Sequence, residues 1–132
     1  MRIIYTNESG GVSVVIPTGE VDIETLIATV VPQGVDYSVI EEDIAADREF
    51  RGAWIKAGDA IDYDIEKAQA ITKDKLRAER APLLNSLDVS YMKALEVNAD
   101  TAEIVTEKQR LRDITKLVDE AKTVEELKEI TV

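Results

Sequence analysis

The hydrophobic pattern of the chain changes once, close to Tyr63. Before this point, short runs rich in β-branched residues alternate with turn-forming residues, as in RIIYT, VSVVIP and AIDYD. After it, apolar residues recur with the 3.6-residue period of an α-helix. Strands followed by helices are typical of the α+β class. We therefore expect a small mixed or antiparallel N-terminal sheet with one short helix, followed by a C-terminal helical hairpin.

The length of 132 residues suits one domain with a single core. We predict a strand-rich part over residues 1–63 and a helical part over residues 64–132, forming one compact unit or two small subdomains. The first part begins with a hairpin whose turn is NESGG, followed by a short helix capped by Asp22. A second hairpin turns over residues 56–59, where Gly58 provides the positive φ of a tight turn. The large side chains of Phe50 and Trp54 are interpreted as core anchors.

The helical part contains a proline within an otherwise helical pattern. Pro82 has no amide hydrogen and its ring crowds the preceding turn, so we expect a kink or a helix restart near Ala81. Asp88 is then the candidate N-cap of the next apolar segment. Further along, two candidate capping boxes precede the last two helices. These boxes pair Asp100 with Glu103 and Thr123 with Glu126.

The formal charge of −11 is unevenly distributed. Residues 1–63 carry 12 acidic and 4 basic residues, and residues 64–132 carry 15 acidic and 12 basic residues. Such a negative field repels nucleic acid and anionic lipid, so neither is expected as a partner. A protein partner with a basic face fits better. The polar residues after MRIIY and the lack of a long apolar run predict neither a signal peptide nor a membrane-spanning helix.

Several classes of chemistry are disfavoured by the composition. The chain has no cysteine and no histidine, which removes thiolate catalysis and the commonest proton shuttle and metal ligand. No nucleophile elbow, phosphate-binding glycine loop or calcium-loop pattern occurs. We therefore expect no enzyme, no cofactor and no catalytic or metal site. A weaker alternative is a small-molecule or metal-binding module built from the acidic clusters, namely Glu41, Glu42, Asp43, Asp59, Asp62 and Asp64.

The remaining class is a scaffold or partner-binding module. Its amphipathic helical hairpin suits a partner's helix or a second copy of the chain, which would make a homo-oligomer, although the same apolar stripe also suits the domain's own core. Basic residues cluster in KLRAERAPLLNSLD, where Arg77 and Arg80 alternate with acidic residues. A solvated helix face with pairs four residues apart explains such a mixture better than partner binding does.

Several segments of the chain follow a pattern found in one group of proteins. They read FRxAW, KAxxIxxDxLRxxRxPLLxxLDxxYMxALE, KQxLRDI and a closing TxEEL. Together they cover about two-thirds of the chain and include Trp54, Arg77, Arg80, Pro82 and Arg112. On these residues the chain resembles small proteins of bacteriophage tail regions, namely tail-fibre assembly and tail assembly chaperone proteins. The closing segment lacks the tryptophan and proline usual in that group.

The resemblance implies a non-enzymatic factor that binds a tail or tail-fibre protein in the host bacterial cytoplasm during assembly. The alternative is a structural component, a small adaptor or connector that stays in the tail of the virion. Candidate partner-binding residues are Trp54, Arg77, Arg80 and Arg112. The three arginines suit carboxylates on a partner, or ties between the helices of the chain itself.

Overall fold

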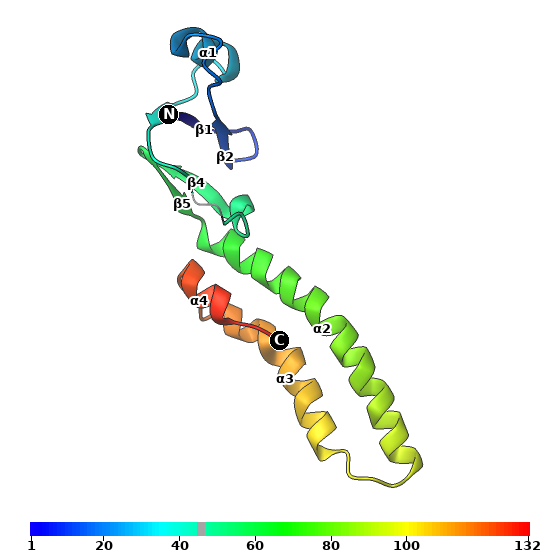
Figure 1. Cartoon of the computed structure of the whole chain (residues 1–132). Helices are drawn as coiled ribbons and strands as arrows, with labels where there is room; N and C mark the ends of the chain where they lie inside the picture. The colour runs from blue at the N-terminus through cyan, green and yellow to red at the C-terminus, as the bar shows by residue number, and fades with distance from the viewer. Residues whose placement is uncertain (45–46) are drawn as a thin grey trace. The chain divides into compact units, whose positions relative to one another are not determined.

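The computed structural model describes residues 1–44 and 47–132, and the chain divides into two compact units, Met1–Asp64 and Ile65–Val132. The first unit contains antiparallel sheets with a short helix, and the second contains long helices packed as a hairpin (Figure 1). The predicted α+β class is therefore confirmed, and the sheets are antiparallel rather than mixed.

The first unit is built from two small sheets. β1 (Arg2–Thr6) lies between β2 (Val12–Val15) and β3 (Tyr37–Ile40), and β4 (Trp54–Ala57) pairs with β5 (Ala60–Tyr63). A 3-10 turn, η1 (Arg51–Ala53), leads into β4. The core contains Ile4, Val12 and Trp54, with Val14, Ile40, Ile44, Ile61 and Tyr63 packed against them. Residues from both sheets thus share one apolar cluster.

Local signals in this unit act as the sequence predicts. Asp22 caps α1 (Ile23–Val30) by accepting a hydrogen bond from the Thr25 amide at 2.9 Å. In the first turn, the Asn7 side-chain oxygen accepts from the amides of Ser9 and Gly11. Gly58 adopts a φ of 61° between β4 and β5. Both predicted hairpins are confirmed by the strand pairing.

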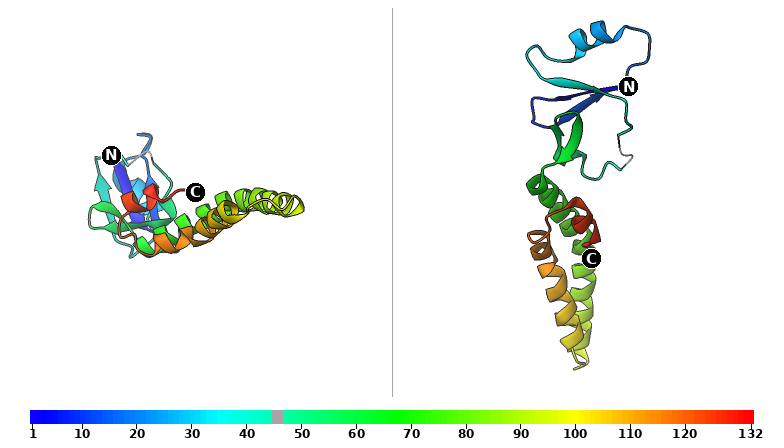
Figure 2. Two further views of the ribbon diagram at one scale, coloured as in Figure 1. Left: turned by 90° about the horizontal axis from the view of Figure 1, so that it is seen from below. Right: turned by 90° about the vertical axis from the view of Figure 1, so that its left-hand side faces the viewer.

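The second unit consists of α2 (Ile65–Glu96), α3 (Ala102–Val118) and the short α4 (Val124–Glu129). α2 and α3 lie side by side in both views of Figure 2. The loop before α4 is fastened to α2, because Gln69 donates a 2.9 Å hydrogen bond to the Ala121 carbonyl. The core side chains of this unit come from all three helices and the loop: Ala68, Thr72, Leu76, Leu111, Ile114, Val118, Ala121, Val124 and Leu127.

The expected restart near Ala81 is wrong, because α2 is one helix of 32 residues that contains Pro82. The physical reason is the position of the proline on the helix. Pro82 has no amide hydrogen to donate to the carbonyl of Ala78. Both residues are exposed, so water can hydrogen bond to that carbonyl instead. Asp88 is therefore not an N-cap but an internal residue of α2.

The two predicted capping boxes of the C-terminal helices have different outcomes. Thr123 caps α4 by accepting from the Glu126 amide, and the Glu126 carboxylate accepts from the Lys122 amide at 2.7 Å. The box at Asp100 is wrong, because α3 begins one residue later than such a box requires, with Thr101 as its N-cap. Asp100 instead accepts a hydrogen bond from the Ala102 amide.

Candidate partner-binding surfaces

Three polar contacts join α2 to α3 along one side of the hairpin. Lys73 pairs with Asp119 at 2.5 Å, and Asp88 pairs with Lys108 at 2.6 Å. Between them, the Arg80 guanidinium donates to the backbone carbonyls of Leu111 and Arg112 at 3.1 and 3.0 Å. Spacings of seven and eight residues on α2 return to the same side of a helix, so the contacts form one row.

We call this side the cross-linked face and define it by its charged residues. They are Lys73, Asp74, Arg77, Arg80 and Asp88 of α2, Lys108 and Arg112 of α3, and Asp119, the C-cap of α3. These five cations and three carboxylates give the face a formal charge of +2, in a chain whose total is −11. Positive charge is thus concentrated on one side of the second unit, where it favours an acidic partner segment.

The three predicted arginines differ in how much of their charge the hairpin uses. Arg80 is tied to α3 by its two hydrogen bonds. Arg77 pairs with Asp74 one turn away at 3.1 Å, and its side chain remains 55% exposed. Arg112 is exposed, and the described residues give its side chain no hydrogen bond or ion pair. Arg77 and Arg112 are therefore accessible to a partner's carboxylate, whereas Arg80 orders the hairpin.

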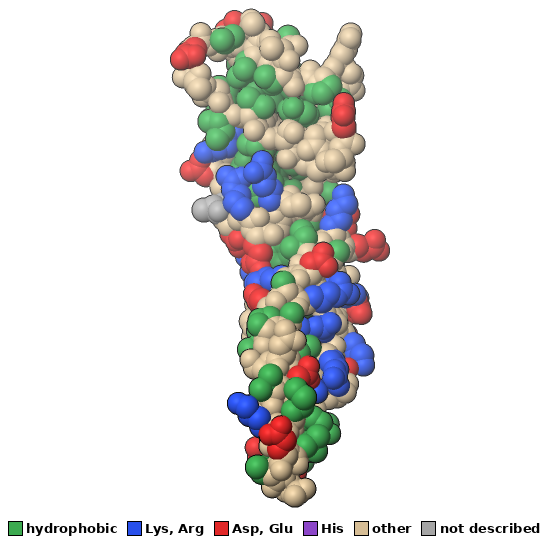
Figure 3. All heavy atoms as spheres, turned by 90° about the vertical axis from the view of Figure 1, so that its right-hand side faces the viewer, with side chains coloured by type: hydrophobic (Ala, Val, Ile, Leu, Met, Phe, Trp, Pro, Cys, Tyr) green, Lys and Arg blue, Asp and Glu red, His purple; other side chains and the backbone are tan. Residues whose placement is uncertain are grey.

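Apolar side chains are exposed near the turn between α2 and α3. This distal patch consists of Val89, Met92, Leu95, Val97 and Val105, whose exposures are 46%, 57%, 53%, 73% and 49%. Met92 and Leu95 lie four and seven residues after Asp88, and Val105 lies three residues before Lys108. These three side chains therefore continue the cross-linked face toward the turn. Figure 3 shows hydrophobic side chains on the surface toward this end of the hairpin.

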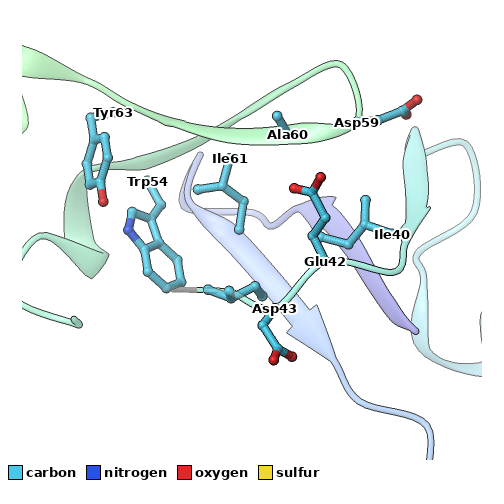
Figure 4. Close-up of a pocket in the computed structure, with 9 residues that line it drawn as sticks. Ile40, Glu42, Asp43, Trp54, Asp59, Ala60, Ile61 and Tyr63 are labelled. Carbon is cyan, nitrogen blue, oxygen red and sulfur yellow. The ribbon is translucent and has the colours of Figure 1, made fainter. Parts of the chain in front are cut away.

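Trp54 lies in the first unit, where its side chain is 2% exposed and belongs to the core. The Arg48 guanidinium lies 5.4 Å from the centre of its ring. One side of Trp54 lines a cavity of about 180 Å³ (Figure 4). Its other lining residues are Ile40, Glu42, Asp43, Ile44, Asp59, Ala60, Ile61 and Tyr63. This burial agrees with the interpretation of Trp54 as a core anchor, and leaves only this cavity wall for contact.

Several carboxylates of this unit, including Asp43 and Asp59 of the cavity lining, are engaged in contacts within the unit. Asp43 pairs with Arg2, and Glu41 pairs with the N-terminal amine at 3.3 Å. Asp59 accepts a 2.6 Å hydrogen bond from the Ser38 hydroxyl. Across residues 1–44 and 47–132, acidic side chains form no group suited to hold a metal ion. The same ranges contain no helix with the length and apolar character needed to cross a membrane.

The sequence pattern identifies the apolar residues of the distal patch but does not predict their exposure to solvent. The apolar segment after Asp88 contains Val89, Met92, Leu95 and Val97 at helical spacing, which usually indicates a core-facing stripe. In the structure they are exposed, and the part of α2 after Leu76 has no fully buried residue.

Comparison with known proteins gives no relative. No protein-family model, curated protein or solved structure matches this chain.

Proposed function

We propose that this protein is a non-enzymatic assembly factor that binds a bacteriophage tail or tail-fibre protein through the distal patch and the cross-linked face. The observation that carries the proposal is the exposure of the distal patch. Exposed apolar groups that adjoin one another are characteristic of sites for other proteins. The tail-region resemblance supports the choice of partner, since the segment KAxxIxxDxLRxxRxPLLxxLDxxYMxALE contains the α2 residues of both surfaces.

The proposed mechanism is reversible burial of an apolar segment of the partner. Met92, Leu95 and Val105 would take up its apolar side chains, and Arg77 and Arg112 would pair with carboxylates farther along the same segment. The first unit, with 13 acidic and 4 basic residues over Met1–Asp64, would keep the complex soluble during assembly in the host bacterial cytoplasm.

The proposal is tested by mass spectrometry on purified phage particles and on complexes captured from infected cells. An assembly factor is expected in complexes with tail or fibre protein and absent from finished particles. Presence in particles at a fixed ratio to tail proteins would instead identify a resident structural component, which is the alternative function.

The docking surface is tested by the double variant Met92→Glu/Leu95→Glu in the same capture. Because both side chains are exposed, the variant should fold normally, as far-UV circular dichroism can verify. We expect capture of this variant to recover no tail protein. The control Ile16→Glu, at a residue 63% exposed in the first unit, should recover as much tail protein as the wild type. Equal recovery with the double variant would exclude the distal patch as the docking site.

A further inference from the structure

A second surface of the helical unit lies between α3 and the C-terminal segment. It is an open groove of about 490 Å³ whose lining residues are Arg110, Asp113, Ile114, Leu117, Glu126, Glu129, Ile130 and Thr131. None of them belongs to the distal patch or to the cross-linked face. The volume falls within the range of sites that bind ligands or side chains of partners.

The floor of the groove is apolar. Ile114 is almost fully buried, Ile130 is half-buried, and Leu117 is 53% exposed. Leu117 lies three residues after Ile114, so the two side chains follow one side of α3. An occupant that covers Leu117 would remove apolar surface from water, which favours binding.

The rim of the groove is acidic. Glu126 and Glu129 stand one turn apart on α4, and the described residues offer the Glu129 carboxylate no hydrogen bond or ion pair. Arg110 is the one cation of the lining, and it is bound by both carboxylate oxygens of Glu107 at 2.7 and 3.0 Å. These hydrogen bonds raise the pKa of Arg110 and lower that of Glu107. The charge available to an occupant is therefore negative.

The backbone of the walls restricts the conformation of the occupant. The lining residues of α3 and of α4 are helical, and Ile130 and Thr131 follow the end of α4 without forming a strand, so an extended peptide would find no sheet edge to pair with. A helix satisfies its own backbone hydrogen bonds and presents apolar side chains on one side.

From this geometry we infer that the α3–α4 groove binds an amphipathic helix of a partner protein that carries lysine or arginine beside its apolar residues. The apolar residues lie over Leu117 and Ile130, and the cations pair with Glu126 and Glu129. This site has the opposite charge preference to the cross-linked face, so the two surfaces select different segments.

The test uses the full chain and two synthetic probes. The first is a fluorescein-labelled amphipathic helix of roughly 16 residues with leucine on one side and lysine on the other. The second has glutamate in place of lysine. Fluorescence anisotropy at about 150 mM salt should show binding of the lysine probe only. No binding of the lysine probe, or equal binding of both probes, would overturn the inference.

Matched variants separate the groove from the general negative charge of the chain. Glu129→Lys should lower the affinity for the lysine probe about tenfold. Glu125→Lys makes the same charge change outside the groove, and should keep the affinity within about twofold of the wild-type value. Leu117→Asp should also weaken binding about tenfold, although it adds negative charge, and Val105→Asp should not. Equal weakening by Glu129→Lys and Glu125→Lys would show diffuse attraction and contradict the inference.

Analytical ultracentrifugation of the same proteins tests a second copy as the occupant. The wild-type chain and Leu117→Asp should sediment alike. A wild-type dimer that Leu117→Asp abolishes would assign the groove to self-association and overturn the proposal. Because these measurements need no phage protein, they can fail while the proposed assembly function stands, and the reverse also holds.

Discussion

The two halves of the helical hairpin have the same secondary structure but different packing. In the half next to α4, α2 and α3 contribute the buried residues Ala68, Thr72, Leu76, Leu111, Ile114 and Val118. Over residues 81–107, the half next to the turn, no residue is fully buried. The difference follows from α4, because two helices alone cover only the seam between them, whereas a third covers part of their flanks. The buried core of this unit and the exposed distal patch therefore lie in different halves of one hairpin.

The largest expected contrast comes from removing a leucine in each half. Leu111→Ala removes a side chain that is 1% exposed and should lower the free energy of unfolding by about 2–5 kcal/mol. Leu95→Ala, at a half-exposed position, should change it by less than about 0.5 kcal/mol. Urea unfolding followed by circular dichroism at a helix wavelength measures both. Similar losses in the two variants would mean that the distal half carries a core of its own.

The single tryptophan provides an internal control for this experiment. Trp54 lies in the first unit, so its fluorescence follows that unit while circular dichroism mainly follows the helices. Leu111→Ala should shift the circular dichroism transition more than the fluorescence transition. Coincident shifts would show that the two units unfold together.

Pro82→Ala should stabilise the hairpin, since an internal proline costs up to about 3 kcal/mol relative to alanine. Hydrogen exchange locates the effect, with slower amide exchange expected mainly over residues 81–96. Ala81→Gly, a change in the opposite direction by roughly 1 kcal/mol, serves as the matched comparison. Faster exchange in Pro82→Ala would indicate that the proline fits a bend needed for packing against α3.

A smaller effect is expected from the arginines of the cross-linked face. Arg80→Ala removes two hydrogen bonds to α3 and should cost about 1 kcal/mol of stability. Arg77→Ala breaks an exposed pair within α2 and should cost less than about 0.5 kcal/mol. Thermal unfolding of both variants distinguishes them. A larger loss in Arg77→Ala would reverse their assignment as partner contact and structural tie.

The smallest expected effect is a decrease in stability at low pH. Hydrogen bonds from Arg110 lower the pKa of Glu107, and those from Lys116 and Gln109 lower the pKa of Asp113. A carboxyl whose pKa is lower in the folded state stabilises that state above its unfolded pKa, and this contribution is lost as the pH falls through the folded value. Melting temperature should therefore decrease slightly below pH 4.5, the ordinary value for glutamate. Glu107→Gln should reduce this dependence.

Local features of the fold could be predicted from the sequence because nearby residues determine them. The caps at Asp22 and Thr123 and the turn at Gly58 depend on side chains or φ angles within a few residues. The continuity of α2 through Pro82 could not be predicted in this way. It depends on which side of the helix faces water, and that is decided by packing against α3 and α4.

The same reason explains what was missed at the candidate surfaces. Spacing placed Met92 and Leu95 on an apolar stripe, but spacing is identical whether or not another helix covers the stripe. It likewise marked Arg77, Arg80 and Arg112 without separating the residue that binds α3 from those that remain accessible. The α3–α4 groove depends on where a six-residue helix returns to the hairpin, for which the sequence contains no local signal.

The row of contacts at Lys73, Arg80 and Asp88 also fixes how α3 is aligned along α2. Sliding α3 by one helical turn, about 5.4 Å, would separate all three donor–acceptor pairs together. The hairpin therefore has one register, and the distances between groups on its surface are constant. The register fixes, for instance, the position of Val105 on α3 relative to Met92 and Leu95 on α2. A segment docked as proposed would therefore have to match these positions along its length as well as by its chemistry.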